Sequence, residues 1–160
     1  MQILFLYYSK TGHTLEAVNA VAEGVRAAGS EADILDVSDF HAGVLANYDG
    51  LIVGSPCWAG SITTGGVAKV VRLAIQSLPP DCLKGKRCGG VSVHSKMGGD
   101  TTVKTLGRLL SEKGCDDYRP GPAVKAGVPF SVRIGPSVVA QDEERFRAFG
   151  SAFVNKSKGV

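Results

Sequence analysis

The predicted fold depends on one stretch, Ser9-Lys10-Thr11-Gly12-His13-Thr14. An apolar run, Ile3 to Tyr8, precedes it, and the length and β-prone residues of this run are typical of a fully buried strand. Leu15 to Ala28 follow with apolar side chains at helical spacing, and Gly29 provides a C-terminal stop. The sequence therefore predicts a strand, a short hydroxyl-rich turn and a helix, in that order.

The turn itself predicts a phosphate site. The unpaired N–H groups at the start of a helix carry partial positive charge and bind a phosphate group well. Ser9, Thr11 and Thr14 add hydroxyl donors at the same point, and Gly12 lets the backbone come close to a ligand. Serine and threonine also cap helices without binding anything. Three hydroxyls and a glycine within six residues favour the phosphate site.

Composition and charge are those of an ordinary globular protein with one domain, residues 1–160. The chain can bury a substantial core, and 44% of its residues are apolar and 21% charged. Its 18 basic and 15 acidic side chains give a net charge of +3 and are scattered, so nucleic-acid binding is not expected. No apolar run approaches the roughly 18 residues that cross a bilayer, so no membrane segment is expected.

The remaining compositional signals point to the cytoplasm. The N-terminus leads straight into a strand without a basic region, so we expect no signal peptide. Cys57, Cys82, Cys88 and Cys115 contain no Cys-x-x-Cys pair and are interpreted as reduced thiols. No His/Cys or carboxylate cluster has the spacing of metal ligands, so no metal site is predicted.

Strands and helices alternate along the chain. Further strands are expected at residues 32–37, 50–55, 89–94 and 117–124, the last at a sheet edge because it contains Pro120 and Pro122. Further helices are expected at residues 67–78, 103–110 and 142–153, residues 39–48 form a polar connection, and residues 125–140 are left unassigned. Such alternation predicts an α/β protein with a parallel sheet covered on both faces.

The hydroxyl-rich turn fits the pattern [Ser/Thr]-x-Thr-Gly-x-Thr at every defined position, and it resembles the phosphate loop of flavodoxins. The resemblance implies a three-layer, doubly wound parallel five-stranded sheet in the order 2-1-3-4-5. It also implies flavin mononucleotide (FMN), with its phosphate held by Ser9, Lys10, Thr11, Gly12, His13 and Thr14. In such sheets the ligand lies beyond the carboxyl ends of the strands. Three loops would meet there, at residues 9–14, 55–63 and 94–100.

The second of these loops holds the only tryptophan, Trp58. An exposed indole beside a phosphate site can cover one face of a flavin ring, although Trp58 could instead pack against its own loop. Flavodoxins carry an aromatic residue in the corresponding loop. Cys57 is expected to fill space rather than to react with the flavin. The cofactor contacts predicted in this loop are Ser55, Pro56, Cys57, Trp58, Ala59 and Gly60.

The third loop contains no aromatic residue, whereas many flavodoxins place a tyrosine there. One flavin face is therefore open, or covered by Met97 or by a partner subunit. His94 is the candidate catalytic residue, as a hydrogen-bond donor to a substrate carbonyl or to a reduced ring. The cofactor contacts predicted in this loop are His94, Ser95, Met97, Gly98, Gly99 and Asp100.

Residues 98–102 and the leucines after them are similar to the tryptophan-repressor-binding-protein type of NAD(P)H:quinone oxidoreductase, which shares the fold and forms tetramers with shared active sites. The resemblance implies an enzyme that takes hydride from NAD(P)H and reduces a quinone-like acceptor, and it implies a homo-oligomer. The alternative is a flavodoxin-type carrier that passes single electrons between redox proteins. Carriers are typically strongly acidic, so the net charge of +3 and the missing second aromatic favour the enzyme. The complete phosphate loop disfavours an interaction module without flavin.

Overall fold

The structure is a computed structural model, and it describes residues 1–57, 65–94, 98–125 and 140–155. Its strands are β1 (Gln2–Tyr7), β2 (Glu31–Asp36), β3 (Gly50–Cys57), β4 (Arg87–His94) and β5 (Asp117–Lys125). Its α-helices are α1 (His13–Ala27), α2 (Lys69–Gln76), α3 (Gly99–Ser111) and α4 (Ala140–Val154). Two 3₁₀ helices, η1 (Val37–Asp39) and η2 (Ala42–Asn47), lie where a polar connection was predicted.

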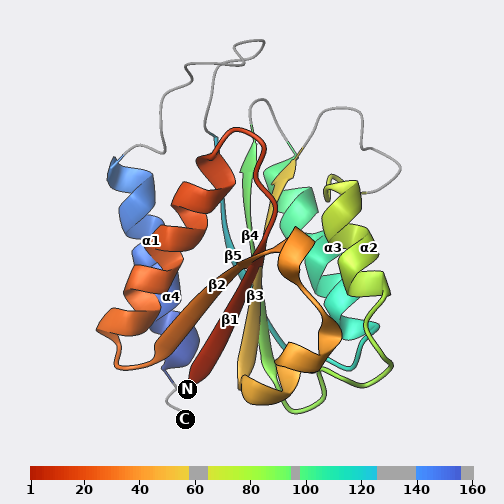
Figure 1. Ribbon diagram of the computed structural model, residues 1–160. Helices are drawn as coiled ribbons and strands as arrows, with labels where there is room; N and C mark the ends of the chain where they lie inside the picture. Colours follow the sequence, from red (N-terminus) through yellow and green to blue (C-terminus); the bar gives the residue numbers. More distant parts are fainter. Residues whose placement is uncertain (58–64, 95–97, 126–139, 156–160) are drawn as a thin grey trace.

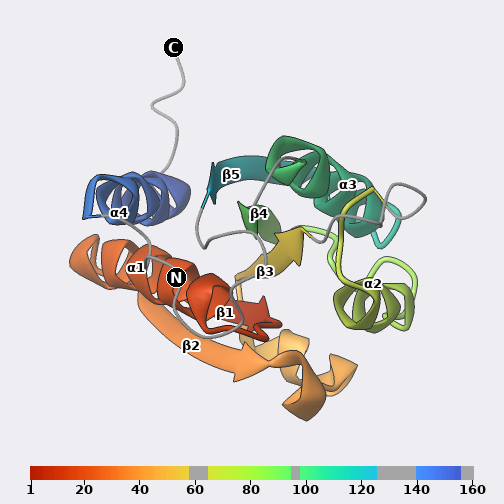
Figure 2. The ribbon, with the colours of Figure 1, turned by 90° about the horizontal axis from the view of Figure 1, so that it is seen from above.

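The strands form one sheet in the order β2-β1-β3-β4-β5, and each neighbouring pair is parallel. Helices α1 and α4 cover one face of the sheet, and α2 and α3 cover the other (Figure 1, Figure 2). The predicted three-layer, doubly wound architecture and the strand order are confirmed. The predicted edge position of the last strand is also confirmed, since β5 pairs only with β4 in this sheet.

Each face of the sheet has its own apolar core. Phe5, Val21 and Phe146 belong to the core under α1 and α4, and Leu6 and Leu106 belong to the core under α2 and α3. Within the part of the chain that the structure describes, no helix has the length and apolar character needed to span a bilayer.

Two predicted boundaries beside the second loop are wrong, and contacts at the end of β3 explain both. Strand β3 does not end at Ser55 but continues through Pro56 to Cys57, because these residues pair with the end of β4. Helix α2 does not begin at Val67, because Val67 forms an antiparallel bridge with Cys57. The returning chain is thus held to the end of β3 before the helix can begin.

Helices α1 and α4 approach each other closely at two glycines. A Cβ atom on Gly24 would lie 2.0 Å from the carbonyl oxygen of Arg147, and one on Gly150 would lie 2.0 Å from that of Val21. These obstacles are backbone atoms, which cannot move aside as a side chain does. The glycines therefore set the distance between the two helices, and through it the position of α1.

The Gly24→Ala variant is expected to lower the free energy of unfolding by about 1–3 kcal/mol, because overpacking forces the helices apart. Urea denaturation followed by circular dichroism measures this change. Asn19→Ala is the matched control, since Asn19 is exposed on the same helix and its replacement also raises helix propensity. Equal stability of Gly24→Ala and Asn19→Ala would show that the close contact does not constrain the helices.

Candidate functional site

The loop between β1 and α1 is closed by two hydrogen bonds. The amide of Tyr8 donates to the carbonyl of Gly54 at 3.3 Å, and the amide of Gly12 donates to Ser9 Oγ at 3.0 Å. Because Ser9 Oγ acts as an acceptor here, its own O–H still has a proton to donate. The loop is therefore preformed, and it keeps a hydroxyl donor.

Gly12 is the N-cap of α1 and has a φ of +91°, a left-handed conformation that glycine adopts without steric cost. A Cβ atom on Gly12 would meet no heavy atom within 4 Å, so the space beside the backbone is open. The amide of Glu16 donates to the carbonyl of Gly12 at 3.0 Å. The amides of His13, Thr14 and Leu15 precede this first turn and have no acceptor within the helix.

The side chains at the start of α1 differ in exposure. Thr11 is exposed, whereas Thr14 is only 3% exposed. Helix α1 lies close to β3 here, since a Cβ on Gly54 would come within 2.6 Å of Val18 Cγ2. His13 Nδ1 is buried and has no hydrogen-bond partner among the described residues. A buried polar atom of this kind normally has a hydrogen-bond partner, which a ligand or a water molecule can provide.

Ser55 serves the scaffold beneath the second loop. It is fully buried, its Oγ accepts a hydrogen bond from the amide of Ala68 at 3.0 Å, and it donates to the carbonyl of Pro56 at 2.9 Å. Ser92 Oγ in turn donates to the carbonyl of Ser55 at 2.9 Å. The hydroxyl of Ser55 is thus occupied within the protein and anchors the chain that returns toward α2.

The second and third loops meet at Cys57. A Cβ on Gly66 would lie 3.0 Å from Cys57 Sγ and 2.4 Å from Thr102 Oγ1, and a Cβ on Gly98 would lie 2.9 Å from the same sulfur. Both glycines have positive φ, +83° and +97°. Thr102 Oγ1 donates to the carbonyl of Gly98 at 3.0 Å and holds the start of α3. Cys57 is buried between the two loops, a position that suits a space-filling residue.

His94 ends β4 beside the first turn of α3. A Cβ on Gly99 would lie 2.4 Å from His94 Nδ1, so only glycine allows this approach. Nδ1 is buried and has no hydrogen-bond partner in the described part of the chain. Burial lowers the pKa of His94, the nearby Asp100 opposes this shift, and Lys125 on β5 adds to it. The imidazole is therefore mainly neutral at pH 7 and offers one N–H.

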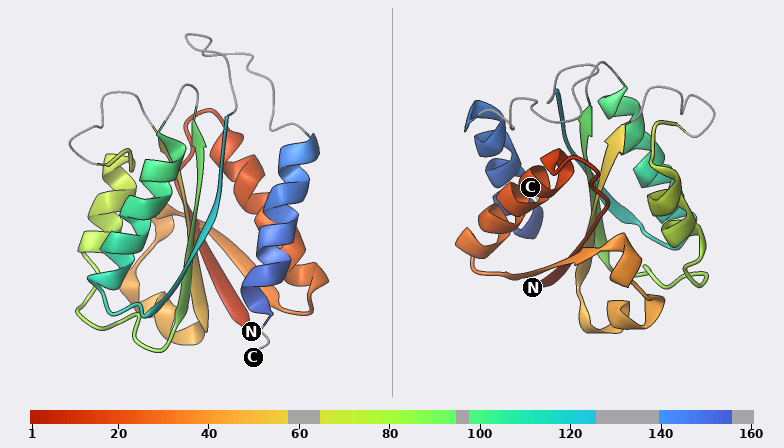
Figure 3. Two further views of the ribbon diagram at one scale, coloured as in Figure 1. Left: turned by 180° about the vertical axis from the view of Figure 1, so that it is seen from behind. Right: turned by 45° about the horizontal axis from the view of Figure 1, so that its top comes forward.

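The described parts of the three loops gather at the carboxyl edge of the sheet (Figure 3). Cys57 and His94 are register partners at the ends of β3 and β4, and Tyr7 pairs with Gly54 at the end of β1. The predicted cofactor contacts Trp58, Ala59, Gly60, Ser95 and Met97 lie outside the described residues. Gly66, Thr102 and Lys125 also border the candidate site, but they were not among the site residues predicted from the sequence. The only local signal for any of them was the Gly65-Gly66 pair.

The fold and the loop together define a class, the doubly wound α/β proteins with a glycine-capped, hydroxyl-rich loop after the first strand. The profile of the flavodoxin family matches residues 5–127, and the chain belongs to that family. It is 33% identical over 175 aligned positions to an NAD(P)H dehydrogenase (quinone) of Chromohalobacter salexigens. That alignment covers 89% of this chain and 77% of the relative.

Two further likenesses cover nearly whole proteins. The chain is 27% identical over 167 positions to a flavodoxin of Clostridium saccharobutylicum, across 100% of this chain and 99% of that one. The solved structure of oxidised flavodoxin 2 from Bacillus cereus superposes with a TM-score of 0.73 at 20% identity, covering 96% of this chain and 97% of that one. The structural likeness supports the fold.

Proposed function

We propose that this protein binds FMN at the carboxyl edge of its sheet and uses NAD(P)H to reduce quinone-like acceptors. The observation that carries the proposal is the start of α1, where the helix has no side-chain cap, its first amides have no acceptor within the helix, and the space beside Gly12 is open. An FMN phosphate is a dianion that such donors suit. When bound, FMN accepts hydride from a nicotinamide and passes electrons on to an acceptor.

The chain's own residues supply binding and orientation. The amides at the start of α1, with Ser9, Thr11 and Thr14, would hold the phosphate, and Lys10 and His13 flank it. The ring would lie between the second and third loops, where His94 Nδ1 is buried without a partner among the described residues. His94 would donate a hydrogen bond there. Because its imidazole is neutral, it would not oppose the positive charge that the nicotinamide ring acquires when NAD(P)H is oxidised.

The enzyme and the electron carrier remain two distinct candidates. Similarity to an NAD(P)H dehydrogenase (quinone) and the net charge of +3 support the enzyme. The likeness to a Clostridium flavodoxin over the full length of both chains supports the carrier. We favour the enzyme because carriers dock through strongly acidic surfaces.

A homo-oligomer in the cytoplasm is part of this proposal, and light scattering of the purified protein measures the oligomeric state.

The decisive experiment is anaerobic reduction of the purified protein. We expect a yellow protein that releases FMN, that NADH or NADPH alone bleaches, and whose colour benzoquinone restores over many turnovers. Met97→Tyr should cover the open ring face and slow this reduction more than it changes FMN affinity. Oxidised flavin that persists with both nicotinamides, but is reduced once a separate reductase is added, would establish the carrier instead.

A further inference from the structure

The amino edge of the sheet, opposite the candidate site, carries a cluster of thiols. Cys88 is the second residue of β4, and Cys115 lies just before β5 begins. Both face the core between the sheet and helices α2 and α3. Cys82 lies in the turn that leads into β4 and is half-buried. Cys57 is at the other edge of the sheet, so the cluster consists of Cys82, Cys88 and Cys115.

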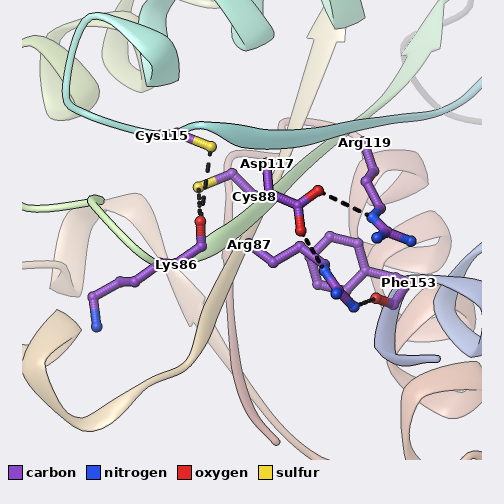
Figure 4. Close-up of polar contacts among 7 residues, drawn as sticks. All are labelled: Lys86, Arg87, Cys88, Cys115, Asp117, Arg119 and Phe153. Atoms are coloured by element: carbon purple, nitrogen blue, oxygen red, sulfur yellow. Dashed lines mark hydrogen bonds and ion pairs between the residues drawn. The ribbon is translucent and has the colours of Figure 1, made fainter. Parts of the chain in front are cut away.

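Cys88 and Cys115 converge on one acceptor. Cys88 Sγ lies 4.0 Å and Cys115 Sγ lies 3.9 Å from the carbonyl oxygen of Lys86, as Figure 4 shows. Both thiols therefore lie beside the same backbone carbonyl, although they come from two different segments of the chain. Cys88 is fully buried, whereas Cys115 keeps 6% of its surface exposed. Cys115 is thus the less deeply buried member of the pair.

The surroundings make the two thiols unequal. The neighbouring Cys88 thiol lowers the pKa of Cys115, as do the amides of Asp117 and Cys88, although burial opposes them. The neighbouring Cys115 and burial raise the pKa of Cys88. Cys115 therefore loses its proton first, and Cys88 stays a thiol. Thiolate is the nucleophilic form of cysteine, so the reactive member of the pair is Cys115.

We propose that Cys88 and Cys115 form a reversible disulfide with hydrogen peroxide as the oxidant. Cys115 thiolate attacks one peroxide oxygen, the O–O bond breaks, and the departing hydroxide takes up the proton that the thiol lost, forming water. Cys88 then attacks the sulfur of the Cys115 sulfenic acid, the S–O bond breaks, and a second water leaves as the S–S bond forms. Two thiols are oxidised by two electrons, and one peroxide is reduced to two waters.

The new bond would join the start of β4 to the segment that leads into β5. The chain between the two cysteines contains β4 and α3, which carry His94 and Gly99 at their far ends. Closing a loop of this length restricts the unfolded chain, so the oxidised protein should unfold at a higher temperature than the reduced one. The pair lies at the opposite edge from the proposed FMN site, and the inference does not depend on that site.

Mass mapping of the full-length protein tests the proposal directly. The protein is treated with hydrogen peroxide, its free thiols are alkylated, and it is digested with trypsin. The four cysteines fall in separate tryptic peptides, 27–69, 73–84, 88–96 and 114–125. We expect a loss of about 2 Da that dithiothreitol reverses, peptide 88–96 linked to peptide 114–125, and an unchanged circular dichroism spectrum. Unmodified thiols in the folded protein, or a link that involves Cys82 or Cys57, would overturn the proposal.

Serine variants test the order of the two steps. Cys82→Ser is the matched control and should keep the link, whereas Cys88→Ser and Cys115→Ser should each abolish it. In Cys88→Ser the sulfenic acid has no resolving thiol, so dimedone should label Cys115. In Cys115→Ser, dimedone should leave Cys88 unlabelled. Labelling of Cys88 and not Cys115 would contradict the assigned roles, and the mapping of the unaltered protein stands even if a variant folds poorly.

Discussion

Replacing Gly12 by aspartate is expected to weaken FMN binding about a hundredfold or more, because two unit charges about 4 Å apart near a protein surface repel by about 4 kcal/mol. The new carboxylate would occupy the open space beside Gly12, where the phosphate is proposed to lie. An acidic residue at the start of a helix favours the helix itself, so the fold should survive. Titration of the apoprotein with FMN, followed by flavin fluorescence, measures the affinity.

Gly12→Asn is the matched control for this change. Asparagine has nearly the shape of aspartate and tolerates a positive φ about as well, but it carries no charge. Riboflavin, which lacks the phosphate, should bind the two variants with equal affinity. If Gly12→Asp and Gly12→Asn weaken FMN binding to the same extent, the phosphate does not lie at the start of α1.

Replacing His94 by alanine is expected to lower NAD(P)H-dependent quinone reduction about a hundredfold, the lower end of the range for a positioned proton donor or acceptor. FMN affinity should change much less, because His94 is not part of the loop proposed to hold the phosphate. His94→Gln keeps an N–H donor and should recover part of the rate. His41→Ala is the matched control, since His41 is exposed in the connection between η1 and η2. Steady-state kinetics with benzoquinone gives the rates.

The pH dependence of the rate tests the protonation state of His94. Burial holds the pKa of His94 below its ordinary value of 6.5, so the imidazole is neutral at pH 7. If the neutral form is the active one, the rate stays constant from neutral pH down to about 6.5 and falls at lower pH, as the imidazole gains a proton. This fall should be absent in His94→Gln. A rate that rises as the pH falls through this range would show that imidazolium is the donor.

The order of strands and helices could be predicted because its signals are local. The apolar run before the hydroxyl-rich loop indicated β1, and Gly29, with a φ of +83°, lies just beyond α1, the helix that it was expected to end. Pro120 and Pro122 indicated the edge strand. Each of these signals depends on residues next to one another in the chain, so no knowledge of packing was needed.

The boundaries around the second loop could not be predicted in this way. Pro56 and Cys57 follow an apolar strand and resemble the start of a loop, yet β3 includes them because the end of β4 pairs with them. Val67 has helical spacing with the apolar residues after it, but its bridge to Cys57 keeps it out of α2. Pairing partners far away in the sequence decided both cases.

By itself, the sequence determined that a strand, a glycine-capped hydroxyl loop and a helix succeed one another, and hence which donors are offered to a phosphate. Only the tertiary structure decided that Ser55 is occupied beneath the loops, that Gly99 lies against His94, and that Cys88 and Cys115 lie beside the same carbonyl. Donor chemistry belongs to the residue type and its neighbours in the chain. Burial and contact depend on segments that are distant in sequence, and they set the pKa of a histidine or a thiol.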